Sequence, residues 1–158
     1  MNRLVLVFAL FGIASSTDAD LSGPALIVDG DTITISGNKI RLNGIDTPEQ
    51  NQTCRRAGIT WRCGYEATET LRKWTYTKEV RCVGNTKDRY GRLIANCFVD
   101  GYNVNARLVY EGLALAYRKY SKQYVPEEDK ARAAKRGMWA GEFVAPWDWR
   151  KGKRLTSE

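Results

Sequence analysis

The chain has 158 residues and carries 25 Lys and Arg residues against 18 Asp and Glu residues, for a net charge of +7. It contains no histidine, which excludes a Ser-His or Cys-His triad and removes the usual general base. Such a basic chain favours a polyanionic partner, namely nucleic acid, an acidic polysaccharide or a membrane surface, although charge can also serve solubility alone.

Residues 1–19 have the layout of a secretory signal peptide. A short basic start precedes the apolar run 4–14, and small residues follow it. A membrane anchor is the alternative, but a span needs about 20 apolar residues and no such run follows downstream. We expect cleavage after Ser16 or, slightly better, after Ala19, giving a secreted or periplasmic protein without a membrane anchor. Residues 20–158 then form a single domain, because no linker or repeat divides them and they are numerous enough for a core.

Short strands are predicted in the N-terminal part of this domain. Residues 25–28 are a strand candidate, and residues 32–35 and 39–43 alternate between polar and apolar side chains. A two-residue turn at Gly37-Asn38 between the last two segments predicts a hairpin. Counting outward from this turn pairs Ile35 with Ile40, Ile33 with Leu42, Asp31 with Gly44 and Asp29 with Asp46. One face of the hairpin is therefore apolar, and carboxylates collect at its open end.

Helices and strands are both expected in the C-terminal part. Helices are predicted from apolar spacing and end signals at 66–76, 103–110 and 126–136. Strands are predicted at 79–83 and 93–99, joined by a polar turn. The tail, residues 139–149, is rich in tryptophan, and its segment 147–149 is expected to pack on the barrel rather than to meet a partner. Five strands with interspersed helices favour a small α+β domain around a curled sheet or barrel.

Four cysteines, an even number after a signal peptide, predict two disulfide bonds. Three pairings are possible. We favour two local bridges, in which Cys54–Cys63 closes a short loop and Cys82–Cys97 joins the strands of the second hairpin. A zinc site is the alternative, but the chain lacks both a C-x-x-C pair and any histidine.

The acids of the N-terminal part are concentrated in one segment. Between residues 21 and 65, every acid lies within residues 28–49, namely Asp29, Asp31, Asp46 and Glu49. Clustered carboxylates repel one another unless a cation is present, and oxygen ligands suit Ca²⁺ or Mg²⁺. Arg41 lies in the same segment, although on the other face of the hairpin, and Arg92 lies in the later turn. A hard dication with two arginines suits an anionic phosphoryl transition state.

Each of these segments alone is also typical of an ordinary turn, but together they form a specific pattern. D-G-D-T at 29–32, R-L-N-G-I-D-T-P-E at 41–49 and D-R-Y-G-R at 88–92 resemble the staphylococcal-nuclease family, and the resemblance spans roughly residues 25–139. It implies an OB-fold, a five-stranded barrel with three helices. It also implies a Ca²⁺-dependent phosphodiesterase that hydrolyses single- and double-stranded DNA and RNA by in-line attack of water, leaving 3′-phosphate ends. We expect the protein to be a monomer.

The resemblance further implies roles for individual residues. The metal would be held by the carboxylates of Asp31 and Asp46 and the backbone carbonyl of Thr47. Glu49 would act as general base, and the phosphate would be bound by Arg41 and Arg92. The substrate would also meet Arg89, Tyr90 and Tyr117, the last stacking on a base.

This chain departs from the family pattern at several positions. Arg89 stands where the family type has a lysine, and Lys119 stands where it has a second base-stacking tyrosine. The four cysteines are absent from the family type, and Asp29 has no metal-binding role in it. The complete set of acids and arginines favours an exported bacterial nuclease. The alternatives are a non-catalytic OB-fold binding module and an accessory protein of envelope or succinoglycan-type exopolysaccharide synthesis.

Overall fold

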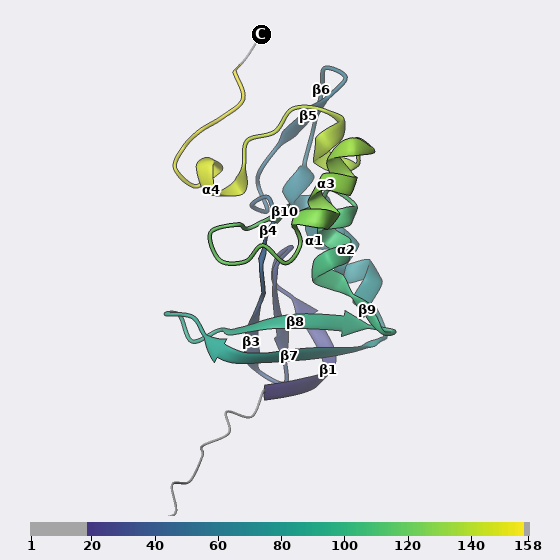
Figure 1. The fold of residues 1–158 in the computed structure, drawn as a ribbon, viewed down its shortest axis with the longest axis vertical. Helices are drawn as coiled ribbons and strands as arrows, with labels where there is room; N and C mark the ends of the chain where they lie inside the picture. Colours follow the sequence, from purple (N-terminus) through teal and green to yellow (C-terminus); the bar gives the residue numbers. More distant parts are fainter. Residues whose placement is uncertain (1–18, 157–158) are drawn as a thin grey trace, which may run out of the picture.

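The computed structural model describes residues 19–156. The predicted signal peptide lies outside the described residues, apart from Ala19. Within residues 19–156, no helix is both long enough and apolar enough to cross a membrane. Figure 1 shows a β-barrel at the lower end of the molecule, with the helices and a small hairpin extending from its upper side.

Five strands close into the barrel, as predicted. Strand β1 (Ala19–Ile27) pairs antiparallel with both β2 (Thr32–Ile35) and β7 (Glu79–Lys87). Strand β8 (Leu93–Val99) pairs antiparallel with β7 and parallel with β3 (Asn38–Leu42), which closes the sheet. The expected α+β fold with a five-stranded barrel is confirmed. Strand β1 is longer than the predicted 25–28. The prediction missed its first residues because a Gly-Pro pair within the strand is atypical of a strand pattern.

The predicted register of the first hairpin is wrong. Ile33 pairs with Ile40, and the turn lies at Ser36-Gly37 rather than one residue later. Both turn residues have positive φ, 48° and 79°, as the preferred type I′ hairpin turn requires. The shift moves each partner by two residues, so every side chain stays on its predicted face. The carboxylates are nevertheless placed differently, since the Leu42 N–H donates to the Asp31 carbonyl at 2.8 Å.

The pairing of Asp46 also departs from the prediction. The expected pairing of Asp46 with Asp29 is replaced by a short antiparallel ladder in which Asp46 pairs with Leu115. This ladder joins β4 (Ile45–Asp46) to β10 (Leu115–Ala116). The ladder brings Asp46 next to the C-terminal half of the chain. The prediction had placed the acids at the end of one hairpin and did not include this contact.

The three predicted helices form close to their expected bounds. They are α1 (Cys63–Thr75), α2 (Val104–Tyr110) and α3 (Val125–Ala133). The shorter elements were not predicted, because two- to four-residue segments carry little periodicity. They are β5 (Cys54–Arg56), β6 (Ile59–Trp61), β9 (Tyr102–Asn103), the 3₁₀ helix η1 (Gly137–Ala140) and α4 (Pro146–Trp149).

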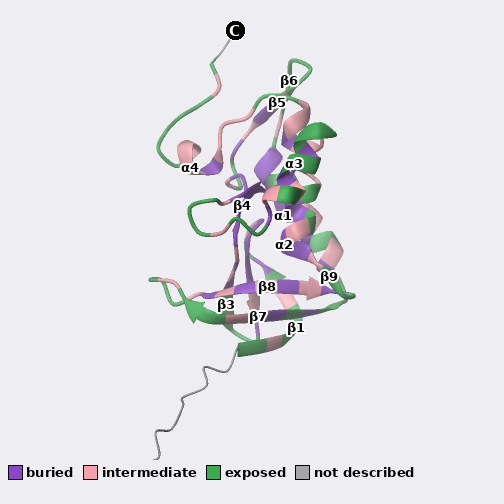
Figure 2. Ribbon diagram, viewed as in Figure 1, coloured by how far each residue is buried: buried purple, intermediate pink, exposed green. Residues whose placement is uncertain are grey.

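Two buried clusters stabilise the domain. The larger fills the barrel and the inner faces of the helices, and includes the apolar face of the first hairpin. The smaller lies around Cys54, Cys63, Leu115 and Met138, and the aromatic side chains of the tail pack against it. In Figure 2, α4 carries the colours of buried and half-buried residues. Both favoured disulfides, Cys54–Cys63 and Cys82–Cys97, are present.

Candidate functional site

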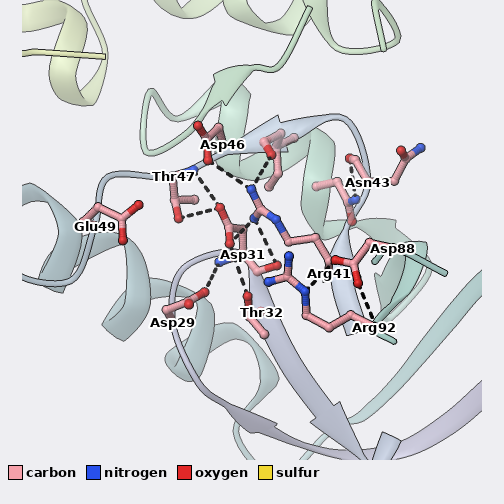
Figure 3. Close-up of polar contacts among 12 residues, drawn as sticks. Asp29, Asp31, Thr32, Arg41, Asn43, Asp46, Thr47, Glu49, Asp88 and Arg92 are labelled. Carbon is pink, nitrogen blue, oxygen red and sulfur yellow. Dashed lines mark hydrogen bonds and ion pairs between the residues drawn. The ribbon is translucent and has the colours of Figure 1, made fainter. Parts of the chain in front are cut away.

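The fold brings three residues of the acidic segment into contact. Asp31 precedes β2, Asp46 lies in β4, and Thr47 follows it; all three are buried. The Thr47 backbone N–H and hydroxyl donate to Asp31 Oδ2 at 2.9 and 3.0 Å. The Asp31 N–H donates in turn to Asp29 Oδ1 at 3.0 Å, so Asp29 braces the turn (Figure 3). We call Asp31, Asp46 and the nearby Glu49 the acidic notch.

Arg41 lies between the two buried carboxylates. It forms ion pairs with Asp31 and with Asp46, the latter at 3.0 Å between Nη2 and Oδ1. It also donates to the carbonyl of Ile45 at 3.3 Å. Burial lowers the pKa of Arg41 and the nearby charge of Arg92 lowers it further, whereas Asp46 opposes both effects. The strand pattern alone could not show that Arg41 points at the acids; the structure shows that it bridges them.

Arg92 is fixed by the turn that precedes it. Asp88 Oδ2 accepts from Arg92 Nε at 2.7 Å, and Oδ1 accepts from the backbone N–H groups of Tyr90 and Arg92 at 2.9 and 3.0 Å. Burial raises the pKa of Asp88, but these donors outweigh it and leave the pKa below its usual value. Figure 3 shows the Arg92 side chain on the same side of the site as Arg41. The D-R-Y-G-R turn thus aims one arginine at the notch.

Glu49 lies on a loop that Gln52 holds in place. The Gln52 N–H donates to the Glu49 carbonyl at 2.7 Å, and its side-chain oxygen accepts from the Glu49 N–H at 3.2 Å. Its side-chain nitrogen donates to the Val144 carbonyl at 2.7 Å. A Cβ atom at Gly64, in the first turn of α1, would lie 1.7 Å from the Glu49 carbonyl oxygen, so only glycine allows this packing. Gln52 was not predicted from the sequence, because the polar segment around it resembles an ordinary exposed loop.

Arg150, at the end of α4, reaches the same notch. Its Nη1 donates to Glu49 Oε1 at 2.7 Å and to Asp46 Oδ1 at 3.1 Å, while its Nη2 donates to Asp46 Oδ2 at 2.7 Å. Burial lowers the pKa of Arg150, but the bonds to both carboxylates raise it above its usual value. Sequence reasoning missed Arg150 because it lies 104 residues from Asp46 and belongs to no spacing pattern. The only sequence feature near Arg150 was the aromatic tail, which predicted packing on the domain but no contact with the acids.

The predicted substrate-binding residues lie on two loops. Arg89 and Tyr90 are exposed, with the Arg89 guanidinium 4.9 Å from the Tyr90 ring centre. Tyr117 is half-buried and stacks on Trp147 of the tail, with ring centres 5.4 Å apart and planes 8° from parallel. Beside this pair lies a cavity of about 730 Å³. Its lining combines aromatic and basic side chains, including Tyr117, Lys119, Trp139, Trp147, Arg150 and Lys151.

The donor chemistry of the notch fits a hard dication. Asp31 and Asp46 offer carboxylate oxygens, and Thr47, in contact with Asp31, carries the predicted carbonyl ligand. In the part of the chain that the structure describes, no three His, Cys, Asp or Glu side chains form a metal-binding group. A metal ion here would therefore depend on two carboxylates, a carbonyl and water.

Known proteins resemble this chain over most of its length. The profile of the family described as "Staphylococcal nuclease homologue" matches residues 39–141. An uncharacterized endonuclease of Haemophilus influenzae is 32% identical over 164 residues, which cover 99% of this chain and 86% of that protein. The micrococcal nuclease of Shigella flexneri is 32% identical over 155 residues, 86% and 84% of the two chains. The succinoglycan biosynthesis protein ExoI of Rhizobium meliloti is 36% identical over 121 residues, 74% and 63% of the two chains.

Proposed function

The chain belongs to the staphylococcal nuclease family, and we propose that it is an exported, Ca²⁺-dependent phosphodiesterase that hydrolyses DNA and RNA. The observation that carries the proposal is the convergence of hard oxygen ligands with two arginines. Asp31 and Asp46 share Arg41, and the D-R-Y-G-R turn aims Arg92 at the same place. This combination suits a phosphodiester anion better than any neutral substrate.

The proposed chemistry is an in-line displacement at phosphorus. Arg41 and Arg92 bind the phosphate oxygens through paired N–H groups and stabilise the charge that grows in the transition state. Glu49 accepts the proton of the attacking water, and the 5′-oxygen leaves, so the product carries a 3′-phosphate. When bound, Ca²⁺ supplies Lewis-acid polarisation of the phosphate.

The substrate is proposed to be nucleic acid of either sugar and either strandedness. The net charge of +7 attracts a polyanion. Tyr90 and the cavity beside Tyr117 offer aromatic and basic side chains, which bind single strands by stacking and by phosphate contacts without reading the sequence. We propose that the protein acts as a monomer.

Export is supported by the covalent structure. The Cys54–Cys63 and Cys82–Cys97 disulfides are typical of proteins outside the reducing cytosol. Together with the signal-peptide layout of residues 1–19, they favour a periplasmic or secreted enzyme.

A second candidate function is a role in exopolysaccharide synthesis. It is favoured by the name of the Rhizobium meliloti relative, which matches 74% of this chain. In that case the OB-fold would bind an acidic polymer, and phosphodiester cleavage would be incidental or absent.

A cleavage assay separates these functions. We expect the oxidised protein to degrade single-stranded DNA, duplex DNA and RNA with Ca²⁺, to leave 3′-phosphate ends, and to be inactive with a chelator. Glu49→Gln should slow cleavage by about 10²–10⁴-fold with the fold intact by circular dichroism. Glu79→Gln, which neutralises an exposed acid on β7, is the matched control and should retain full activity. Absence of cleavage with every divalent ion tried would rule out the nuclease proposal.

A further inference from the structure

The carboxylate of Asp46 is paired with two internal cations. Its Oδ1 accepts from Arg41 at 3.0 Å and from Arg150 at 3.1 Å, and its Oδ2 accepts from Arg150 at 2.7 Å. Asp46 itself is fully buried. One of the two carboxylates expected to bind the metal therefore already holds three guanidinium N–H groups.

A dication would compete with the Arg150 guanidinium group for the oxygens of Asp46. Ca²⁺ binds carboxylate oxygens at about 2.3–2.6 Å, and the Arg150 nitrogens occupy both oxygens of Asp46. Two guanidinium groups already share this buried carboxylate, and both would repel a dication strongly, because little water screens the charges. We propose that Arg150 is an internal counter-ion of the acidic notch that a divalent cation must displace from Asp46, so that this tail residue sets the metal affinity. The inference rests on the proposed function, since it takes the notch to be the metal site.

The structure favours Arg150 over Arg41 as the cation that moves. The Arg41 side chain is 17% exposed and also donates to the backbone carbonyls of Asp31 and Ile45, which tie it to the barrel. The Arg150 side chain is 40% exposed and borders the cavity of about 730 Å³, which has room for a displaced guanidinium group.

The displacement requires a side chain to move, not the whole tail. The tail is also held by the Gln52 bond to the Val144 carbonyl and by a 2.8 Å bond from Arg55 to the Thr156 carbonyl. The stack of Trp147 on Tyr117 adds a third attachment. These contacts do not involve Asp46, so they persist when Arg150 leaves it.

The test is Ca²⁺ binding measured by isothermal titration calorimetry on the oxidised protein. Arg150→Gln removes the charge and keeps much of the length, and Arg150→Lys keeps the charge without the bidentate geometry. Arg154→Gln is the matched control, because Arg154 is a tail arginine that donates to the backbone carbonyls of Trp149 and Lys153. We expect Arg150→Gln to lower the Kd for Ca²⁺ by about tenfold or more, Arg150→Lys to lower it less, and Arg154→Gln to change it by less than about twofold.

Each outcome is decisive. Tighter binding by Arg150→Gln than by Arg154→Gln supports the displacement. Equal binding by all variants overturns it and leaves the metal site standing, and weaker binding by Arg150→Gln overturns it by making Arg150 a support for the ligands. If neither the wild type nor any variant binds Ca²⁺, both this inference and the proposed metal site fail.

Discussion

The candidate site has a barrel side and a tail side, and they are built differently. On the barrel side, the carboxylates of Asp31 and Asp88 accept hydrogen bonds from nearby backbone N–H groups, and the Asp88 carboxylate in turn pairs with Arg92. On the tail side, Trp147 and Arg150 reach the site through ring stacking and ion pairs between side chains. Backbone groups therefore fix the carboxylates of the barrel side directly, whereas the Arg150 side chain on the tail side reaches the notch through ion pairs alone. The comparison distinguishes a half whose carboxylates are fixed by the backbone, which we propose binds phosphate, from a half held by side-chain contacts.

The largest expected effect is that of removing the central cation of the barrel side. Arg41→Ala leaves Asp31 and Asp46 buried and without that ion pair, so the free energy of unfolding should fall by about 3–5 kcal/mol. Urea denaturation measures this change. Arg81→Ala, which breaks an exposed pair with Asp20, is the control and should have little effect. If both variants lost equal stability, the barrel side would not owe its rigidity to Arg41.

Removing each disulfide compares the two sides directly. The bridges span 9 and 15 residues, so each should contribute about 3 kcal/mol through loop closure. The Cys54→Ser/Cys63→Ser variant should slow cleavage more than Cys82→Ser/Cys97→Ser. The reason is that Cys54 and Cys63 lie in the buried cluster that the tail packs on, beside the loop of Glu49. Cleavage rates at matched fractions of folded protein decide the matter, and equal rates would contradict the division into two sides.

Asp88→Asn tests how the barrel side aims Arg92. The pKa of Asp88 is lowered in the folded state, so its ionised form stabilises the fold at pH values above its usual pKa of 3.8. That stability is lost as the pH falls through the lower, folded-state pKa. The wild type should therefore lose stability relative to Asp88→Asn on acidification below about pH 4, as followed by denaturation at several pH values. Cleavage by the variant at neutral pH should fall by about tenfold or more, because Arg92 loses its ion pair. A pH-independent stability difference would refute the assignment.

The smallest expected effect is that of Trp147→Ala on the tail side. Loss of the stack on Tyr117 should cost at least about 1 kcal/mol of stability. It should also shift Ca²⁺ affinity in the same direction as Arg150→Gln but by less, because the tail then holds Arg150 less firmly. Trp149→Ala is the control, since Trp149 contacts Arg154 instead of Tyr117. Calorimetry on both variants gives the comparison, and an opposite shift for Trp147→Ala would argue against a tail that positions Arg150.

Much of this protein could be predicted from sequence because the relevant signals are short in range. The alternation in residues 32–35 and 39–43 identified the first hairpin, the apolar spacing identified three helices, and the cysteine spacing identified two local bridges. The three short motifs brought Asp31, Arg41, Asp46, Glu49 and Arg92 under consideration, and the fold places them around one site. The roles assigned to those residues stay predictions.

The sequence by itself determined which residues could perform the chemistry, because residue type and spacing of a few positions are local properties. The tertiary structure decided how they meet. The hairpin register depended on the positive φ of Ser36, which no alternation pattern encodes. Two long-range contacts were decided only by packing, namely those of Arg150 with Asp46 and Glu49 and the bond from Gln52 to the Val144 carbonyl. Contacts between segments about a hundred residues apart leave no periodic trace in the chain.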